Sequence, residues 1–180
     1  EEGKTWAGEI DARAKQIADS VRDARFRWQE PEDFSLTALL HERAPAWAAT
    51  RAANTEIKIE ASDPFVLHCD REQLWRAVRH LLRNARDAME AAHSAQRRIT
   101  LRLLSLPSNQ LELQVEDAGP GVADEAWRRI LREPYSTRDG EGRGYGLLIA
   151  QWLIESLGGS IYLYPSAPDY GARFGIRLPL

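Results

Sequence analysis

The chain has 180 residues, of which 43% are hydrophobic and 28% are charged, and its formal net charge at pH 7 is −3. This composition is typical of a globular protein with a core, and the small net charge gives no overall attraction to nucleic acid. The single cysteine excludes an intrachain disulfide, and no apolar run approaches the roughly 20 residues of a membrane span. Because the chain starts with Glu and shows no signal peptide, we expect a cytoplasmic fragment of a longer protein, whose membrane attachment is left open.

Residues 4–28 are predicted to form one helix with a repeating apolar seam. The seam positions follow alternating steps of three and four residues: Ala7, Ile10, Ala14, Ile17, Val21, Ala24 and Trp28. Such a seam is typical of helices that pack lengthwise. Two interpretations remain: an amphipathic helix packed on its own domain, or the end of a dimerisation helix. Pro31 marks a linker, so we assign residues 1–30 to the C-terminal part of a dimerisation helix and residues 31–180 to a second domain.

The second domain is predicted to interleave helices and strands. Helices are expected at residues 37–53, with Pro45 inside, and then at 71–92, 124–131 and 144–157. Strands are expected at residues 34–36, 56–61, 65–69, 98–106, 110–116, 160–164 and 172–178. This order without strict alternation predicts an α+β domain, with a mixed sheet and helices on one face.

The helix after Asp70 carries the first residues of chemical interest. Asp70 is a good N-cap, and Gln73 completes a capping-box-like start. His80, Asn84 and Asp87 fall together at the edge of the apolar face. An amide buried there without partners costs about 1–3 kcal/mol, so Asn84 is a candidate functional residue. The alternative is an exposed polar residue on a solvated face.

A strand pattern ends at Asp117, which is followed by Gly119 and Gly121. A carboxylate at a strand end can point into a pocket and accept a hydrogen bond from an exocyclic amine such as that of adenine. Glycines let another molecule approach the backbone. The alternative is a plain hairpin turn, but a helical pattern rather than a returning strand follows.

A third stretch opens a helix with Gly142, Gly144 and Gly146. Glycines at a helix start expose N–H groups and the positive end of the helix dipole, which suits phosphate. No strand precedes the turn, so the Rossmann fingerprint fails, and the missing Gly-Lys-Ser/Thr excludes a P-loop. The amide oxygen of Asn84 is a hard ligand of the kind that suits Mg²⁺.

In this order, the three stretches resemble the N, G1 and G2 boxes of the ATP-binding fold shared by sensor histidine kinases, type II topoisomerases, Hsp90-type chaperones and MutL proteins. Asn84-Ala85 matches the N box, residues 117–121 match the G1 box, and residues 142–146 match the G2 box. Residues 133–138 resemble the ATP lid of nitrogen-regulation-type sensor kinases, and residues 171–179 resemble the closing strand. The resemblance implies a Bergerat-type two-layer α/β sandwich, preceded here by one coiled-coil-like helix.

The resemblance also implies a ligand set and an activity. Mg-ATP would bind with adenine at Asp117, Gly119 and Gly121, and with Mg²⁺ at Asn84. The phosphates would lie near Arg138, Arg143, Gly142, Gly144, Gly146 and Leu147. A sensor histidine kinase would pass the γ-phosphoryl group to a histidine outside this chain and then to a response regulator receiver domain. The parent would be a homodimer, with no nucleic acid as partner.

Three positions depart from the common sensor-kinase pattern. His80 stands where most have Asn, and Arg143 where most have Thr; both resemble the chemotaxis histidine kinase. Gly175 stands where many relatives have Thr near the adenine.

His80 also separates the relatives. Topoisomerases, Hsp90-type chaperones and MutL proteins carry Glu at this position as a base that activates water, so His80 favours phosphoryl transfer over steady hydrolysis. With a near-neutral pKa it could act as a base or a phosphate contact; the alternative is a packed rim histidine. His41, in the first helix of the ATP domain, is not expected to be the acceptor. The alternative functions are an ATPase of the same fold and a nucleotide-binding pseudokinase.

Overall fold

The computed structural model describes residues 28–61, 64–127, 129–132, 145–165 and 170–180. Its main element is a five-stranded mixed sheet in the order β2-β4-β5-β7-β6. The strands are β2 (Glu56–Ala61), β4 (Arg98–Leu106), β5 (Gln110–Asp117), β6 (Ser160–Tyr164) and β7 (Arg173–Pro179). Strand β2 pairs parallel with β4, and the other neighbours pair antiparallel. A separate antiparallel pair joins β1 (Glu32–Ser35) to β3 (Val66–Cys69).

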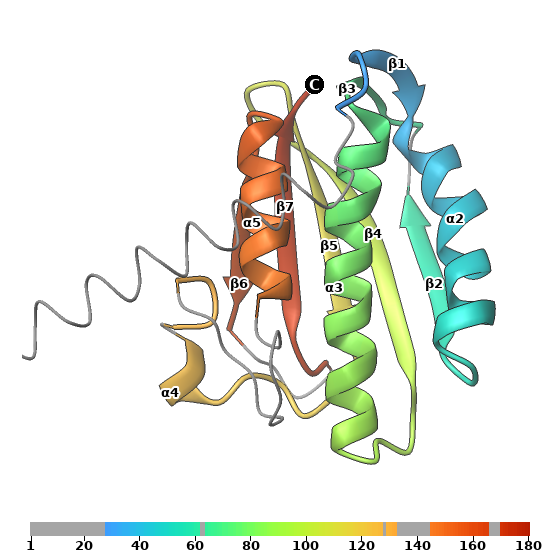
Figure 1. Cartoon of the computed structure of the whole chain (residues 1–180), viewed down its shortest axis with the longest axis vertical. Helices are drawn as coiled ribbons and strands as arrows, with labels where there is room; N and C mark the ends of the chain where they lie inside the picture. The colour runs from blue at the N-terminus through green and yellow to red at the C-terminus, as the bar shows by residue number, and fades with distance from the viewer. Residues whose placement is uncertain (1–27, 62–63, 128, 133–144, 166–169) are drawn as a thin grey trace, which may run out of the picture.

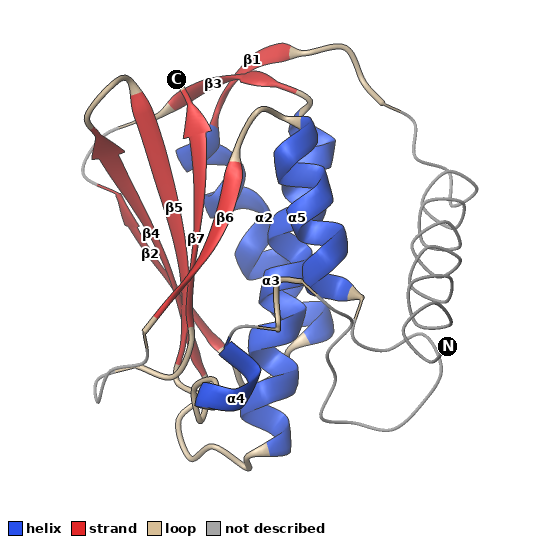
Figure 2. Cartoon of the chain, turned by 90° about the vertical axis from the view of Figure 1, so that its left-hand side faces the viewer, coloured by secondary structure: helices blue, strands red, loops and turns tan. Residues whose placement is uncertain are grey.

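Three helices cover one face of the sheet: α2 (Leu36–Arg51), α3 (Arg71–Ala91) and α5 (Gly146–Ser156). Figure 2 shows the sheet with all three helices on one side of it, and Figure 1 places α3 in front of the central strands. A short helix, α4 (Asp124–Trp127), follows β5. The predicted α+β sandwich, with a mixed sheet and helices on one face, is therefore confirmed. Within the described residues, none of the helices combines the length and apolar character needed to cross a membrane.

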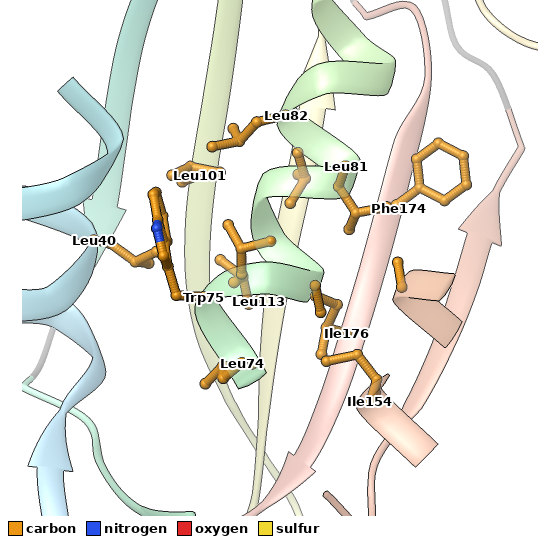
Figure 3. Close-up of a cluster of buried hydrophobic side chains, with 14 of the residues drawn as sticks. Leu40, Leu74, Trp75, Leu81, Leu82, Leu101, Leu113, Ile154, Phe174 and Ile176 are labelled. Carbon is orange, nitrogen blue, oxygen red and sulfur yellow. The ribbon is translucent and has the colours of Figure 1, made fainter. Parts of the chain in front are cut away.

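The core lies between α3 and the two central strands. Leu74, Leu81 and Leu82 of α3 are at most 1% exposed, and they meet Leu101 and Leu113 of the sheet (Figure 3). Side chains alternate between the two faces of a strand, and in β5 the residues Leu111, Leu113 and Val115 take the helix-covered face. By the same alternation Asp117, the last residue of β5, is directed to that face.

The start of α3 forms only half of the predicted capping box. Asp70 Oδ1 accepts hydrogen bonds from the backbone N–H groups of Glu72 and Gln73, both at 3.0 Å. The Gln73 side chain is fully buried, and neither of its polar atoms has a partner among the described residues. Asp70 Oδ2 instead accepts from the backbone N–H of Gln29 at 2.7 Å, which joins the incoming linker to this helix.

The other predicted boundaries agree with the structure to within about two residues, as is usual for helix and strand ends. The exception is α4, which ends at Trp127 rather than at the expected residue 131. Pro45 lies inside α2 without ending it. The predicted N-terminal helix at residues 4–28, apart from Trp28, and the lid-like segment at residues 133–138 lie outside the described residues.

Candidate ATP site

Asp117 is a buried carboxylate, and the described residues donate hydrogen bonds to only one of its two oxygens. The residue is 4% exposed. Both hydrogen bonds that the described residues make to its side chain end on Oδ1, from the backbone N–H of Gly119 at 2.8 Å and of Ala172 at 3.1 Å. These two donors fix the orientation of the carboxylate and leave Oδ2 available for a ligand. An exocyclic amine is a suitable partner, because a carboxylate accepts hydrogen bonds and cannot donate them.

Two glycines make room for this arrangement. A Cβ on Gly119 would stand 2.8 Å from Asp117 Oδ1, and a Cβ on Gly171 would stand 2.4 Å from the same oxygen and 2.4 Å from the Gly119 carbonyl oxygen. The backbone N–H of Gly171 donates to the Asp117 carbonyl at 2.7 Å. Side chains at these positions would displace the carboxylate, so the glycines set its geometry. Gly121 has a φ of 81°, a left-handed conformation that favours glycine.

Helix α3 joins the two ends of the candidate site. At one end, Met89 Cγ lies 3.5 Å from the Cβ position of Gly119, beside Asp117. At the other end, His80 Nδ1 lies 3.6 Å from the Cβ position of Gly146, the first residue of α5. Met89 lies nine positions after His80, which is about 14 Å at the rise of an α-helix. Asn84, half-buried, lies between them.

The end near His80 is basic. Arg83 Nη2 lies 3.3 Å from His80 Nδ1 and 3.1 Å from the Cβ position of Gly146. Burial lowers the pKa of His80 to about 4, and the charges of Arg83 and Arg79 add to this effect. His80 is therefore neutral at pH 7, and the expected near-neutral pKa is wrong. The reason is that most of the ring lies against the protein, next to two guanidinium groups.

The pKa of the Asp117 carboxyl moves the other way. Burial raises it above its ordinary value, and the hydrogen bonds from Ala172 and Gly119 oppose the rise only in part. The nearby Glu116 charge raises it further. A buried carboxylate without a cation partner in the part of the chain that the structure describes is the kind of group that a functional site contains.

The structure brings together some of the predicted site residues and leaves others undescribed. Those described in the region are Asn84, His80, Asp117, Gly119, Gly121, Gly146 and Leu147. Leu147 is buried in the first turn of α5, so only its backbone can face a ligand there. The predicted phosphate contacts Arg138, Gly142, Arg143 and Gly144 lie outside the described residues.

Gly175 does not belong to this region. It pairs with Gln114 in β7, and a Cβ there would stand 2.8 Å from Tyr164 Cε2 and 3.3 Å from Glu112, on the face away from the helices. The expectation that position 175 lies near the adenine is therefore wrong, because the strand alternation turns it to the opposite face. Gly171 and Ala172, whose backbone N–H groups both donate to Asp117, are the residues of this segment that reach the site.

Sequence reasoning missed three residues of the site: Gly171, Ala172 and Arg83. Gly171 contacts Asp117 only through the pairing of β5 with β7, which a local pattern does not reveal. Arg83 stands directly before Asn84 in the sequence. Its position next to Asn84 on α3 could have indicated a place near the site, but only the packing of α3 against α5 brings it to Gly146.

The donor set fits ATP and Mg²⁺. The carboxylate of Asp117 is oriented by backbone donors on Oδ1, and its other oxygen, Oδ2, suits the exocyclic amine of a base. Among the described residues, no group of three or more His, Cys, Asp or Glu side chains could hold a metal ion. A cation here would rely on Asn84, phosphate oxygens and water, and Mg²⁺ is commonly bound in this way.

Comparisons with known proteins identify the family of the chain. The family model described as histidine kinase-, DNA gyrase B- and HSP90-like ATPase matches residues 69–180. The sensor protein FixL of Bradyrhizobium diazoefficiens is 30% identical over 176 residues, covering 96% of this chain and 34% of FixL. The signal transduction histidine-protein kinase AtoS of Escherichia coli is 27% identical over 177 residues, covering 96% of this chain and 28% of AtoS. The chain thus spans about a third of the length of these relatives.

Solved structures share the fold. Full-length ShkA in complex with AMPPNP superposes with a TM-score of 0.69 at 21% identity, covering 99% of this chain and 39% of ShkA. The catalytic domain of histidine kinase ThkA superposes with a TM-score of 0.68 at 22% identity, covering 84% of this chain and 96% of that domain. The chain therefore belongs to the family of histidine kinase-, DNA gyrase B- and HSP90-like ATPases.

Proposed function

We propose that this domain binds Mg-ATP and transfers the γ-phosphoryl group to a histidine on an acceptor helix outside the chain. In the parent protein, the phosphoryl group then passes to the receiver domain of a response regulator. Residues 1–30 are the end of the helix that pairs two copies of the parent, and residues 31–180 are the catalytic domain. The observation that carries the proposal is the carboxylate of Asp117, near one end of α3. Two backbone donors hold its Oδ1, and Oδ2 is available to a ligand.

Adenine recognition falls to Asp117 and its glycines. The ionised carboxylate accepts a hydrogen bond from the exocyclic amine through Oδ2, while Gly119 and Gly121 let the base approach the backbone. The raised pKa of Asp117 means that this ionised form costs free energy in the empty site. An amine donor that reaches Oδ2 offsets that cost, so binding of the base and ionisation of Asp117 support each other.

The phosphates belong at the other end of α3, where α5 begins. Among the described residues, the N-cap residue of α5, Tyr145, makes no side-chain capping bond, and the first N–H groups of a helix, here those of Gly146 and Leu147, have no acceptor within the helix and suit phosphate oxygens. Gly142, Gly144, Arg143 and Arg138 complete this part of the site in our proposal. Asn84 would hold Mg²⁺, which when bound bridges phosphate oxygens and neutralises their charge.

Phosphoryl transfer rather than steady hydrolysis is supported by His80. An imidazole with a pKa of about 4 is a weak base at pH 7. It is therefore poorly suited to take a proton from water. Transfer to a positioned histidine needs no such base, because the acceptor nitrogen attacks with its own lone pair once it is held in line with the leaving oxygen.

The test is incubation with labelled ATP, with and without a separate acceptor-domain protein from the parent. We expect no label on this chain alone and acid-labile label on the acceptor. Asn84→Ala should abolish transfer while the domain stays folded, since Ala is the better helix former. His41→Ala, a change at an exposed residue of α2, should transfer label like the wild type.

Other outcomes point to other functions. Label on this chain itself that disappears in His41→Ala would show that the acceptor is His41. Phosphate release without label on the acceptor would indicate an ATPase of the same fold. ATP binding without either reaction would indicate a pseudokinase.

A further inference from the structure

Arg83 connects the two helices that carry the N box and the end of the G2 box. It lies on α3, directly before Asn84. One of its guanidinium nitrogens, Nη2, is 3.3 Å from His80 Nδ1 on the same helix and 3.1 Å from the Cβ position of Gly146, the first residue of α5. A guanidinium is therefore held where the second helix begins.

Arg83 contacts a different kind of partner from five other arginines of the chain. Arg43, Arg86, Arg102, Arg173 and Arg177 each contact a carboxylate at 2.7 Å or less. No carboxylate of the described residues lies within ion-pair distance of Arg83, and its contact is an imidazole. A carboxylate would cancel the charge of the guanidinium. A neutral imidazole orients it and leaves the full positive charge available.

The protonation state of His80 agrees with this role. A guanidinium can only donate, so His80 Nδ1 must accept, and the single ring proton is on Nε2. Burial and the two neighbouring arginines keep the ring neutral at pH 7, which is the state in which Nδ1 has a free lone pair. The glycine at position 146 leaves the approach to Arg83 open, since any Cβ would crowd the guanidinium.

We propose that Arg83 is a phosphate-binding residue of the ATP site, and that His80 is the positioning residue that holds its guanidinium at the start of α5. Arg is suited to phosphate because its fork of donors matches two oxygens. This inference rests on the proposed function, because it assumes that adenine lies at Asp117 and the phosphates at Gly146. It gives His80 a role other than that of a base.

The experiment measures dissociation constants of ATP, ADP and adenosine for the purified wild-type chain and variants, by calorimetry or nucleotide titration. Arg83→Gln should weaken ATP binding about tenfold to a hundredfold, as expected for loss of a charge-assisted hydrogen bond. Adenosine binding should be unchanged. Arg79→Gln is the matched control, because it removes the same charge one turn earlier on α3 and has no contact with Gly146; it should change ATP binding by less than about threefold.

His80 is tested by replacement with and without an acceptor. His80→Leu should weaken ATP binding about threefold to tenfold, because Arg83 loses the group that orients it. His80→Asn, whose side-chain oxygen can accept from Arg83, should restore most of the affinity. In the Arg83→Gln background, His80→Leu should add little further loss, which a separate structural effect of His80 would not reproduce.

The outcomes separate this inference from the proposed function. Wild-type ATP affinity in Arg83→Gln, or an equal loss of ATP and adenosine binding, would overturn the inference while ATP binding that depends on Asp117 still supports the site. Absence of ATP binding by the wild-type chain, or no effect of Asp117→Asn, would overturn the proposed function itself. A full loss of affinity in His80→Asn would overturn the positioning role of His80.

Discussion

Strand β5 carries two buried carboxylates, Glu112 and Asp117, on opposite faces of the sheet. Glu112 is 2% exposed and Asp117 is 4% exposed. Glu112 accepts hydrogen bonds from Arg177 at 2.7 Å, Gln114 at 2.7 Å and Tyr164 at 2.8 Å, and the Arg177 guanidinium balances its charge. Among the described residues, Asp117 has two backbone donors, both on one oxygen, and no cation within ion-pair distance.

Their pKa values follow from this difference. Burial alone would raise the pKa of Glu112, but the hydrogen bonds from Arg177, Gln114 and Tyr164 outweigh it, so the value lies below the ordinary one. Burial dominates at Asp117, whose pKa is raised. Two carboxylates with little exposed surface therefore have different uses. The satisfied one holds β5, β6 and β7 together, and the unsatisfied one is available to a ligand.

The largest effect is expected when Glu112 loses its cation. Arg177→Met should lower the free energy of unfolding by about 3 kcal/mol, the low end of the range for breaking a buried pair, because Arg177 is itself 37% exposed. Urea denaturation would measure it. Arg102→Met is the control, since the Arg102–Glu60 pair is about equally exposed on both sides, and it should cost about 1 kcal/mol or less. Equal losses of unfolding free energy in Arg177→Met and Arg102→Met would contradict the view that the buried Glu112 depends on its cation more than the half-exposed Glu60 does.

Replacing each carboxylate by its amide should distinguish the ligand-binding role of Asp117 from the stabilising role of Glu112. Asp117→Asn should weaken ATP binding by about 1.5–3 kcal/mol, because a donor replaces the oxygen that would face the adenine amine. Its free energy of unfolding at pH 7 should not fall, since a raised folded-state pKa means that the charged form costs stability above the unfolded value of 3.8. Glu112→Gln should do the reverse: lower stability and unchanged ATP affinity. Calorimetry and urea denaturation of both variants would check this.

The elements of this fold, and the residues of the G1 turn, could be predicted because their signals are local. Alternation in β5 and the helical spacing in α3 are set by neighbours within a few residues. The same alternation sends Asp117 to the helix-covered face once that face is known to be the apolar one. Asn84 and Gly146 could be named for the same reason, since each belongs to a short motif on one element.

The rest depends on contacts between distant segments. Gly171 reaches Asp117 across a gap of 54 residues, and the outer cluster at Glu112 needs the register of three strands. The pKa of His80 depends on burial against α5 and on two arginines, and therefore departs from the value assumed for a free histidine. The place of Gly175 on the outer face likewise depends on the register of β7 against β5, which the segment alone does not reveal.

His80 gives the next largest effect, and it depends on pH. Because folding lowers its pKa from 6.5 to about 4, its contribution to stability is present above pH 6.5 and is lost as the pH falls toward 4. Between pH 7 and pH 5 the wild type should lose about 2 kcal/mol that His80→Asn does not lose. Urea denaturation at the two pH values would measure the difference. A pH-independent difference between the two proteins would show that His80 is not buried as a neutral ring.

The smallest effect on stability is expected from a substitution at Gly175. It tests directly whether only the helix-covered face of the sheet supports the nucleotide. Gly175→Ala places a Cβ 2.8 Å from Tyr164 Cε2 on the outer face. Because that contact is with the edge of the Tyr164 ring, which can shift, the free energy of unfolding should fall by only about 1 kcal/mol. The ATP affinity should be unchanged. Gly171→Ala is the matched change four residues earlier, where the Cβ meets Asp117 and the Gly119 backbone at 2.4 Å. There we expect ATP binding to fall at least tenfold, because the oriented carboxylate must move. Titration of both variants with ATP would measure the contrast, and a loss of affinity in Gly175→Ala similar to that in Gly171→Ala would mean that the outer face also supports the nucleotide.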